Sequence, residues 1–384
     1  MSSRRTAVVP IYCALLLVGG QWPMTSPAYA AAFTVNNISD THDAKPGDGI
    51  CAIPNSKNVC TLRAAIDEVN ALGGKTTHTI KVPANTYLLF LGELTVKAEV
   101  DITGSGAAAT IVDGQKAFRI FLIEKSALVR VSAMTLRNGN AGVTSFGGCI
   151  HNSGKLTLKE SVVSNCVAGN DGGGIRNAAG GFLFVLRSTI SNNKSGGAGE
   201  GAGRSGGGIK NSGLLIVDSS TISGNFAFEG GGLSNGNQGS PSGITFMFST
   251  TVGQNSAAKS HGVGIAVISG QVRMLSSINS NASNDDCLGK VDSQGYNLES
   301  GNTCGLNAVG DKTFADPLLG PLQDNGGPTP THALKSGSVA IDGATNDECP
   351  SVDQRGVKRP IDGNGDSKAI CDIGAFEFES GKRD

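Results

Sequence analysis

The sequence predicts an all-β fold, a right-handed parallel β-helix with a three-strand solenoid, a short N-terminal capping α-helix and an irregular C-terminal cap. Three observations predict it: a glycine-rich motif recurs at intervals of about 24 residues or more, short apolar alternations separate its copies, and asparagines recur at equivalent places. Glycine supplies 56 of the 384 residues, about twice its usual share. Such a composition indicates tight turns rather than a large helical core.

The glycine-rich motif places two or three glycines before an apolar residue and an asparagine two positions after it. Its copies are Gly147–Asn152, Gly172–Asn177, Gly206–Asn211 and Gly230–Asn235, with a weaker copy at Gly262–Ile265. Between them lie short alternations such as Leu156 with Leu158, Leu183–Leu186, Leu214–Val217, Ile244–Phe248, and Val272 with Met274. Period-two alternation is typical of strands with one buried face, so each repeat is one coil. Longer repeats carry insertions such as Ser195–Ser205 that we expect to loop out.

A second set of asparagines ends the strand that follows each apolar alternation. Stacked coils place equivalent residues about 4.8 Å apart, so amides at a repeated turn can bond to one another and to turn backbone. The sequence therefore predicts a structural ladder of Asn165, Asn193, Asn225, Asn255 and Asn281.

Four segments are expected. Arg4 and Arg5, the apolar run Ala7–Gly19 and the small-residue site Ala28–Ala30 predict a secretory signal peptide over residues 1–30. Residues 31–77 are expected to form the N-terminal cap, 78–283 the β-helix repeats and 284–384 the C-terminal cap. In the first cap, Thr61–Leu72 has an apolar helical face, with Thr61 as the N-cap. The mature chain is expected to be secreted and to have no membrane span.

Eight cysteines remain once Cys13 leaves with the signal peptide. An even number in an exported chain favours disulfides, and the cysteines fall into four neighbouring couples. The predicted bridges are Cys51–Cys60, Cys149–Cys166, Cys287–Cys304 and Cys349–Cys371. Zinc is the less favoured alternative, because the sequence has no CxxC spacing and no histidine beside the thiols.

Both ends of the mature chain carry motifs of a known family. Cys60–Ile66 resembles the CSLREA motif of exported bacterial β-helix proteins, although Ala64 stands where that motif has glutamate, which should weaken the helix start. The tail resembles choice-of-anchor Q domain proteins in five stretches: Ala315–Gly320, Asn325–His332, Ala340–Asp342, Asp353–Gly356 and Cys371–Glu377. The resemblance implies architecture but little about activity. Because no hydrophobic stretch follows Glu379, we expect release or loose association rather than anchoring.

One outward basic column is a candidate binding site. His151, Arg176 and Lys210 occupy the same place in three consecutive repeats, so their side chains should stack in a row. The row could bind acidic sugars, and a lyase would need such groups as base and as charge partner. A solvated outer face is the favoured alternative.

Carboxylates give weaker candidates. Asp362, Asn364 and Asp366 alternate as calcium ligands do, with Asp372 as a further donor, but a polar turn is favoured over a Ca²⁺ site. Asp285-Asp286 and Ser260–Gly262 resemble polygalacturonase motifs in the wrong order and are interpreted as chance, with the aspartates assigned to the Cys287–Cys304 loop. Asp353 and Arg355 are interpreted as a buried ion pair.

The sequence favours a surface or secreted carbohydrate-binding or adhesive scaffold of uncharacterised activity. The alternative is a polysaccharide lyase or glycoside hydrolase acting on an acidic polysaccharide. The formal net charge of -1 argues against a nucleic-acid partner. The expected partner is a polysaccharide or cell-surface glycan, and the protein is expected to be a monomer.

Overall fold

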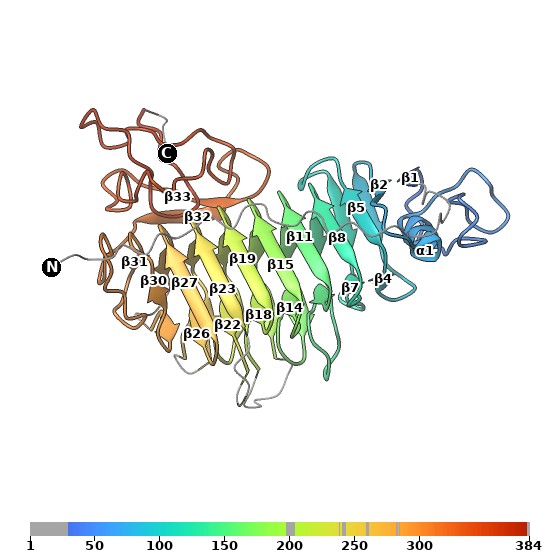
Figure 1. Ribbon diagram of the computed structural model, residues 1–384, viewed down its shortest axis with the longest axis horizontal. Coiled ribbons are helices and arrows are strands. Elements are labelled where there is room, and N and C mark those ends of the chain that lie inside the picture. Colours follow the sequence, from blue (N-terminus) through green and yellow to red (C-terminus); the bar gives the residue numbers. More distant parts are fainter. Residues whose placement is uncertain are drawn as a thin grey trace, which may run out of the picture.

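A computed structural model describes residues 30–381, apart from 197–203, 238, 240–242, 259–260, 282 and 284. Nearly all of the predicted signal peptide therefore lies outside the described residues. The described chain is a right-handed parallel β-helix. Figure 1 shows the coils stacked along the long axis, with a short helix at one end and the C-terminal segment beside the other.

Three long sheets run the length of the solenoid, as the three-strand prediction requires, and a fourth, short sheet joins them in the middle coils. Neighbouring strands within each of these sheets are parallel. Sheet 1 consists of β1 (Ala32–Thr34), β2 (His78–Lys81), β5 (Glu99–Thr103), β8 (Leu128–Ser132), β11 (Lys155–Lys159), β15 (Phe182–Leu186), β19 (Leu214–Asp218), β23 (Ile244–Phe248), β27 (Gln271–Leu275) and β30 (Asp292–Ser293). Sheet 2 consists of β4 (Leu94–Val96), β7 (Phe121–Ile123), β10 (Ile150–Asn152), β14 (Ile175–Asn177), β18 (Ile209–Asn211), β22 (Leu233–Asn235), β26 (Ile265–Val267) and β29 (Cys287–Leu288).

Sheet 3 follows sheet 1 in each coil after a tight corner, and sheet 4 follows sheet 3 in four coils. Sheet 3 consists of β3 (Asn85–Leu88), β6 (Thr110–Asp113), β9 (Thr135–Arg137), β12 (Val162–Ser164), β16 (Thr189–Ser191), β20 (Thr221–Ser223), β24 (Thr251–Gly253), β28 (Ile278–Ser280) and β31 (Leu298–Glu299). Sheet 4 consists of β13 (Val167–Ala168), β17 (Lys194–Ser195), β21 (Phe226–Ala227) and β25 (Ser256–Ala257).

The glycine-rich motif forms the entry to sheet 2. Its apolar residues point inward and stack in register, so that Ile150, Ile175 and Ile209 are fully buried neighbours. The glycines allow the chain to turn closely over this strand. Gly206 has φ +70°, and a Cβ there would approach the Ile209 carbonyl oxygen to 2.3 Å, which other residues cannot accommodate.

The N-terminal helix is confirmed. Helix α1 (Leu62–Leu72) begins after Thr61, whose side-chain oxygen accepts a hydrogen bond from Ala64 N at 3.0 Å. Its apolar face covers the first coil, with Ile66 and Val69 buried in the main core. The solenoid nevertheless begins earlier than predicted, because β1 pairs with β2.

The solenoid also ends later than residue 283. Three short strands, β29, β30 and β31, complete a last coil. Cys304 and Leu306 then join the main core, so the chain just after β31 covers the apolar end.

The predicted irregular C-terminal cap is present in its first part, which covers the apolar end with Cys304 and Leu306, but the rest of the C-terminal segment does not cap the solenoid. It lies beside the coils instead (Figure 1), with an antiparallel hairpin of β32 (Leu319–Gln323) and β33 (Thr331–Leu334). Its contacts are with sheet 3: Gln354 Oε1 accepts from Thr221 Oγ1 at 2.6 Å, and Ala375 N donates to Thr251 Oγ1 at 3.0 Å. The hydroxyl rows of sheet 3 thus provide its docking face.

Candidate functional site

The predicted basic column exists as a row, but Lys210 is covered, and His151 and Arg176 are half-buried. His151 pairs with Arg176 and Arg176 with Lys210 on adjacent strands of sheet 2, and their neighbours inside the strand face the core. Lys210, however, is only 3% exposed. The favoured expectation of a solvated outer face is therefore wrong for Lys210, because the loops that enter sheet 2 fold back over it.

Lys210 lies in a buried polar network. Its Nζ donates to Ser205 Oγ at 2.7 Å and to Ser234 Oγ at 3.1 Å, and Ser205 in turn donates to Asp171 Oδ1. Burial lowers the pKa of Lys210 to about 8. Arg176 donates to Ser212 Oγ and lies 5.7 Å from the centre of the Phe146 ring.

His151 completes the column as a neutral side chain. Burial, with the nearby guanidinium groups of Arg119 and Arg176, lowers the pKa of His151 to about 4. The column thus presents less positive charge to solvent than its sequence suggests. It does not offer an open strip to a large glycan.

We expect Lys210→Met to change how stability depends on pH. The pKa of Lys210 is about 8 in the fold against about 10.4 unfolded, so the fold favours the neutral amine. The contribution of Lys210 to the free energy of unfolding is therefore greatest above the unfolded pKa, where the amine is neutral in both states. This contribution is lost as the pH falls through 8. Wild-type stability relative to Lys210→Met should rise by about 2 kcal/mol from pH 7 to pH 10 in urea unfolding. The exposed Lys368→Met is the control, and a parallel response of both variants would contradict the buried amine.

The asparagine ladder forms with one change of membership. The amide of Asn193 donates to Asn225 Oδ1, Asn225 to Asn255 and Asn255 to Asn281, each at 3.0 Å. Asn165 is not in the ladder. Ser164 pairs with Ser191, so Asn165 is equivalent to Asn192 and takes the left-handed turn position, with φ +56°.

Cys166 occupies the ladder position in that coil. Its backbone N–H donates to Asn193 Oδ1 at 3.0 Å, and its sulfur bonds to Cys149. A second buried ladder runs beside sheet 2, through Asn152, Asn177, Asn211 and Asn235, with amide contacts of 2.7–2.9 Å. Both ladders are structural, since their members are buried apart from the half-buried Asn281.

All four predicted disulfides are present. They join Cys51 to Cys60, Cys149 to Cys166, Cys287 to Cys304 and Cys349 to Cys371. Asp286 supports the third bridge's loop, as its buried carboxylate accepts from Ser300 Oγ and Gly301 N at 2.8 Å each. A role for this aspartate in holding the loop accounts for its burial.

The predicted calcium loop uses its oxygens within its own turns. Asp362 accepts from Gly365 N and Ser367 N, Asn364 from Asp366 N, and Asp366 from Lys368 N, at 2.7–2.9 Å. In the part of the chain that the structure describes, no three His, Cys, Asp or Glu side chains gather as a metal site. The geometry is that of the polar turn favoured by the sequence.

The charged residues of the tail hold the C-terminal segment together. Arg355 pairs with Asp353 at 2.8 Å, and Arg359 pairs with Glu377 at 3.0 Å. His332 Nδ1 lies 2.7 Å from Gly320 O and must donate to it, so Nε2 accepts from Ser223 Oγ at 2.8 Å. Burial lowers the pKa of His332, which keeps this imidazole neutral.

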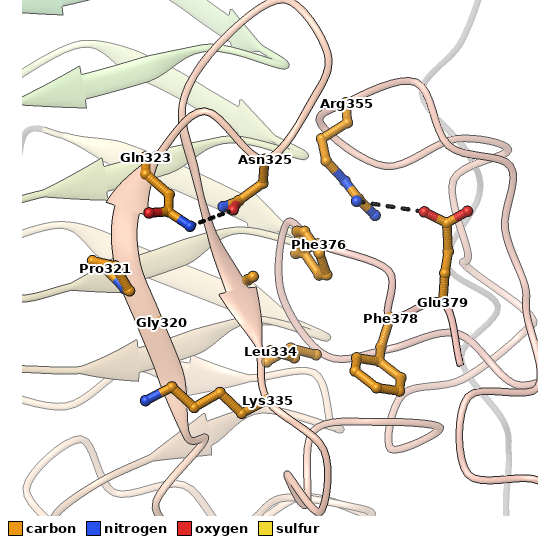
Figure 2. A pocket seen from close by; sticks show the side chains of 11 residues that line it. Gly320, Pro321, Gln323, Asn325, Leu334, Lys335, Arg355, Phe376, Phe378 and Glu379 are labelled. Atoms are coloured by element: carbon orange, nitrogen blue, oxygen red, sulfur yellow. Dashed lines mark hydrogen bonds and ion pairs between the residues drawn. The ribbon is translucent and has the colours of Figure 1, made fainter. Parts of the chain in front are cut away.

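A hollow of about 460 Å³ lies between the β32–β33 hairpin and the end of the chain. Figure 2 shows Arg355 facing Glu379, with Phe376 beside them and Gln323 facing Asn325 across the hairpin. The Arg355 guanidinium lies 3.6 Å from the centre of the Phe376 ring and 3.6 Å from the Glu379 carboxylate. Its charge is therefore matched inside the segment.

A second hollow, of about 350 Å³, has a different character. Four exposed lysines line it at one corner of the solenoid, together with the end of α1 and Glu99. We call it the lysine hollow: Lys75, Lys97, Lys125 and Lys155. Each lysine precedes or begins a strand of sheet 1, and the strands concerned, β2, β5, β8 and β11, are consecutive neighbours. The hollow therefore carries one lysine per coil over four coils.

The wall of the lysine hollow is fixed to the helix. Asn70 in α1 donates from Nδ2 to Thr95 O at 2.7 Å and accepts from Lys97 N at 2.7 Å. Glu99, the carboxylate of the hollow, accepts from Thr77 Oγ1. Among the residues described here, the four lysines form no ion pair shorter than 4.0 Å.

Comparison with known proteins gives distant structural likenesses. No family model and no curated protein matches the chain, so the resemblance to CSLREA and choice-of-anchor Q proteins stays a prediction. The structure of pectate lyase Pel9A has 14% sequence identity and a TM-score of 0.43, over 92% of this chain and 98% of that one. The A-module of mannuronan C-5 epimerase AlgE4 from Azotobacter vinelandii has 14% identity and a TM-score of 0.34, over 70% and 81%. Likenesses this distant carry no argument about chemistry.

The sequence contains one weak signal of the lysine hollow, which is the spacing of its lysines, but the repeated motifs do not include these residues. The four lysines are 22, 28 and 30 residues apart, which is one coil each, but they lie in corners of unequal length. The register of sheet 1 places Lys155 beside Leu128 and not beside Lys125, so it is the stacking of the corners that brings the four lysines around one hollow. The basic column was easier to find because it lies inside a strand with constant register.

Proposed function

We propose that the protein is an exported binder of acidic polysaccharides, a surface or secreted scaffold that does not alter its ligand chemically. The lysine hollow is its binding site. The observation that carries the proposal is the row of four exposed lysines, one on each of four consecutive coils, around a single hollow.

The spacing of the row suits a linear polyanion. Parallel strands lie about 4.8 Å apart, so the coils that carry the lysines step along the solenoid axis at about that interval. A chain of uronic acid residues laid along the axis could place a carboxylate near each ammonium group. Lysine side chains are flexible and hydrated, which favours adaptable binding of a repeating anion over a single fixed geometry.

Export is supported by the four disulfides, which form and persist in oxidising compartments. The motifs at Cys60–Ile66 and in the tail, which resemble exported bacterial proteins, support the same location. No helix of the described residues is long and apolar enough to span a membrane.

A polysaccharide lyase is the second candidate, and the same hollow would serve it. A lysine could remove the proton beside a uronate carboxylate while its neighbours stabilise the developing anion. A glycoside hydrolase would need two carboxylates about 5–10 Å apart. Among the residues that line the hollow, Glu99 is the one carboxylate.

The proposal is tested by titrating the mature protein with polygalacturonate, alginate and neutral glucans, with and without calcium. We expect binding to the two polyuronates alone, weakening as salt rises because exposed charges are screened. Absorbance of unsaturated products and assay of new reducing ends should both stay at background. Unsaturated products would replace the binder with the lyase, and equal binding of neutral glucans would contradict the role of the lysines.

A further inference from the structure

The outer face of sheet 1 carries a continuous apolar surface over three adjacent strands. Successive outward positions on β15, β19 and β23 are occupied by large apolar side chains, with one acidic exception, Asp218. We call this surface the apolar face: Phe182, Phe184, Leu186, Leu214, Ile216, Ile244, Phe246 and Phe248.

These side chains are half-buried against one another, and Ile244 is 46% exposed. The rings of Phe246 and Phe248 stack with centroids 6.3 Å apart. Parallel sheets are usually covered on both faces, and contiguous apolar surfaces of this kind mark interaction sites. In Figure 1 the strands of sheet 1 are seen broadside, with the C-terminal segment beside them.

Charged residues flank the apolar face on both sides. Arg130 lies on β8, three strands before β19, and Asp292 lies on β30, three strands after it. Both belong to one outward row, which runs along the solenoid through Thr157, Phe184, Ile216, Phe246 and Arg273. The row is thus apolar in the middle and carries a partly exposed ion pair at each end, Arg130 with Asp101 and Arg273 with Asp292.

We propose that the apolar face binds a second copy of this chain, with the two solenoids antiparallel and related by a two-fold axis along β19. The rotation places Arg130 of each copy opposite Asp292 of the other. Phe184 then faces Phe246, and Ile216 faces its own equivalent. The arrangement is self-complementary, as a two-fold interface must be.

The size of the surface is adequate for a reversible dimer. The seven strands from β8 to β30, about 4.8 Å apart and mostly five residues long at about 3.3 Å each, give a footprint of about 550 Å². Standard interfaces bury about 800 Å² of accessible surface per partner, which a corrugated face of this footprint approaches. Asp218 would face its own copy at the rim. Burial raises the pKa of Asp218, and the hydrogen bond from Ser219 and the nearby Arg359 and Arg187 only oppose that rise.

Sedimentation velocity of the mature protein from 1 to 100 µM tests the proposal. The wild type should change from monomer to dimer as concentration rises, and Ile216→Asp should raise the dissociation constant at least about 30-fold, because two carboxylates would meet on the axis. Thr157→Asp is the matched control. It adds the same charge two strands away, opposite Arg273 of the partner, and should leave the dimer intact or tighten it.

Two results would overturn the dimer. One is a wild type that stays monomeric over the whole range; the other is equal weakening by Thr157→Asp and Ile216→Asp. Flotation with vesicles of phosphatidylcholine and phosphatidylglycerol covers a lipid partner, and binding by monomeric wild type that Ile216→Asp abolishes would assign the face to lipid instead. Unchanged circular dichroism and melting temperature confirm that each variant folds, and its polygalacturonate binding reports the lysine hollow independently.

Discussion

Asn225→Ala is expected to lower the free energy of unfolding by about 3–5 kcal/mol, because the change leaves several buried polar groups without partners. The Asn225 side chain accepts from both Asn193 N and Asn193 Nδ2, and it donates to Ile190 O and Asn255 Oδ1, at 2.9–3.0 Å. Asn225 is fully buried, so water cannot replace these bonds. Urea unfolding followed by circular dichroism measures the loss.

Asn165→Gly is the matched control for the ladder. Asn165 is exposed and has φ +56°, a conformation that glycine adopts without strain. We expect its stability to stay within about 1 kcal/mol of the wild type. Equal losses at Asn165 and Asn225 would contradict the register that excludes Asn165 from the ladder.

Removal of the bridge between Cys149 and Cys166 is the second large effect. The two cysteines are fully buried and 17 residues apart, and a loop of that length stabilises a fold by about 3 kcal/mol by restricting the unfolded chain. Cys149→Ala combined with Cys166→Ala should therefore lower the free energy of unfolding by about that amount. Urea unfolding without reductant provides the measurement. An unchanged midpoint and slope would show that the bridge contributes nothing.

The fold could be predicted because each coil repeats the same local sequence pattern. Several features depend only on residues close to them in the sequence. They are the glycine-rich motif, the inward isoleucines Ile150, Ile175 and Ile209, and the N-cap Thr61. Neighbouring cysteines indicated the disulfides for the same reason. Such features need no knowledge of how distant coils differ.

The wrong predictions have a common physical cause. Each depends on how separate segments align or pack against one another, which a local sequence pattern does not show. Asn165 and Asn192 both follow a Ser, yet only the strand register shows that Cys166, not Asn165, is equivalent to Asn193. Alternation placed Lys210 outside the core correctly but could not show that Ser205 and Asp171 fold over it. The docking of Gln354 on Thr221 spans 133 residues, beyond what any local pattern reports.

The candidate site was missed because charge alone does not distinguish a corner from a strand. Lys75, Lys97, Lys125 and Lys155 look like scattered surface lysines until β2, β5, β8 and β11 are placed side by side. The basic column was predicted because His151, Arg176 and Lys210 occupy the same position of a repeated motif. The sequence could not show that the loops preceding this motif fold over Lys210.

The most direct test of the lysine hollow is calorimetric titration of polygalacturonate into a triple variant, Lys97→Gln with Lys125→Gln and Lys155→Gln. Each exposed ion pair contributes up to about 1 kcal/mol, so affinity should fall between about 10-fold and 100-fold and the dependence on salt should flatten. The control carries the same loss of charge elsewhere, as Lys335→Gln with Lys358→Gln and Lys368→Gln, and should bind like the wild type. Equal affinities of both triple variants would contradict the lysine hollow as the binding site.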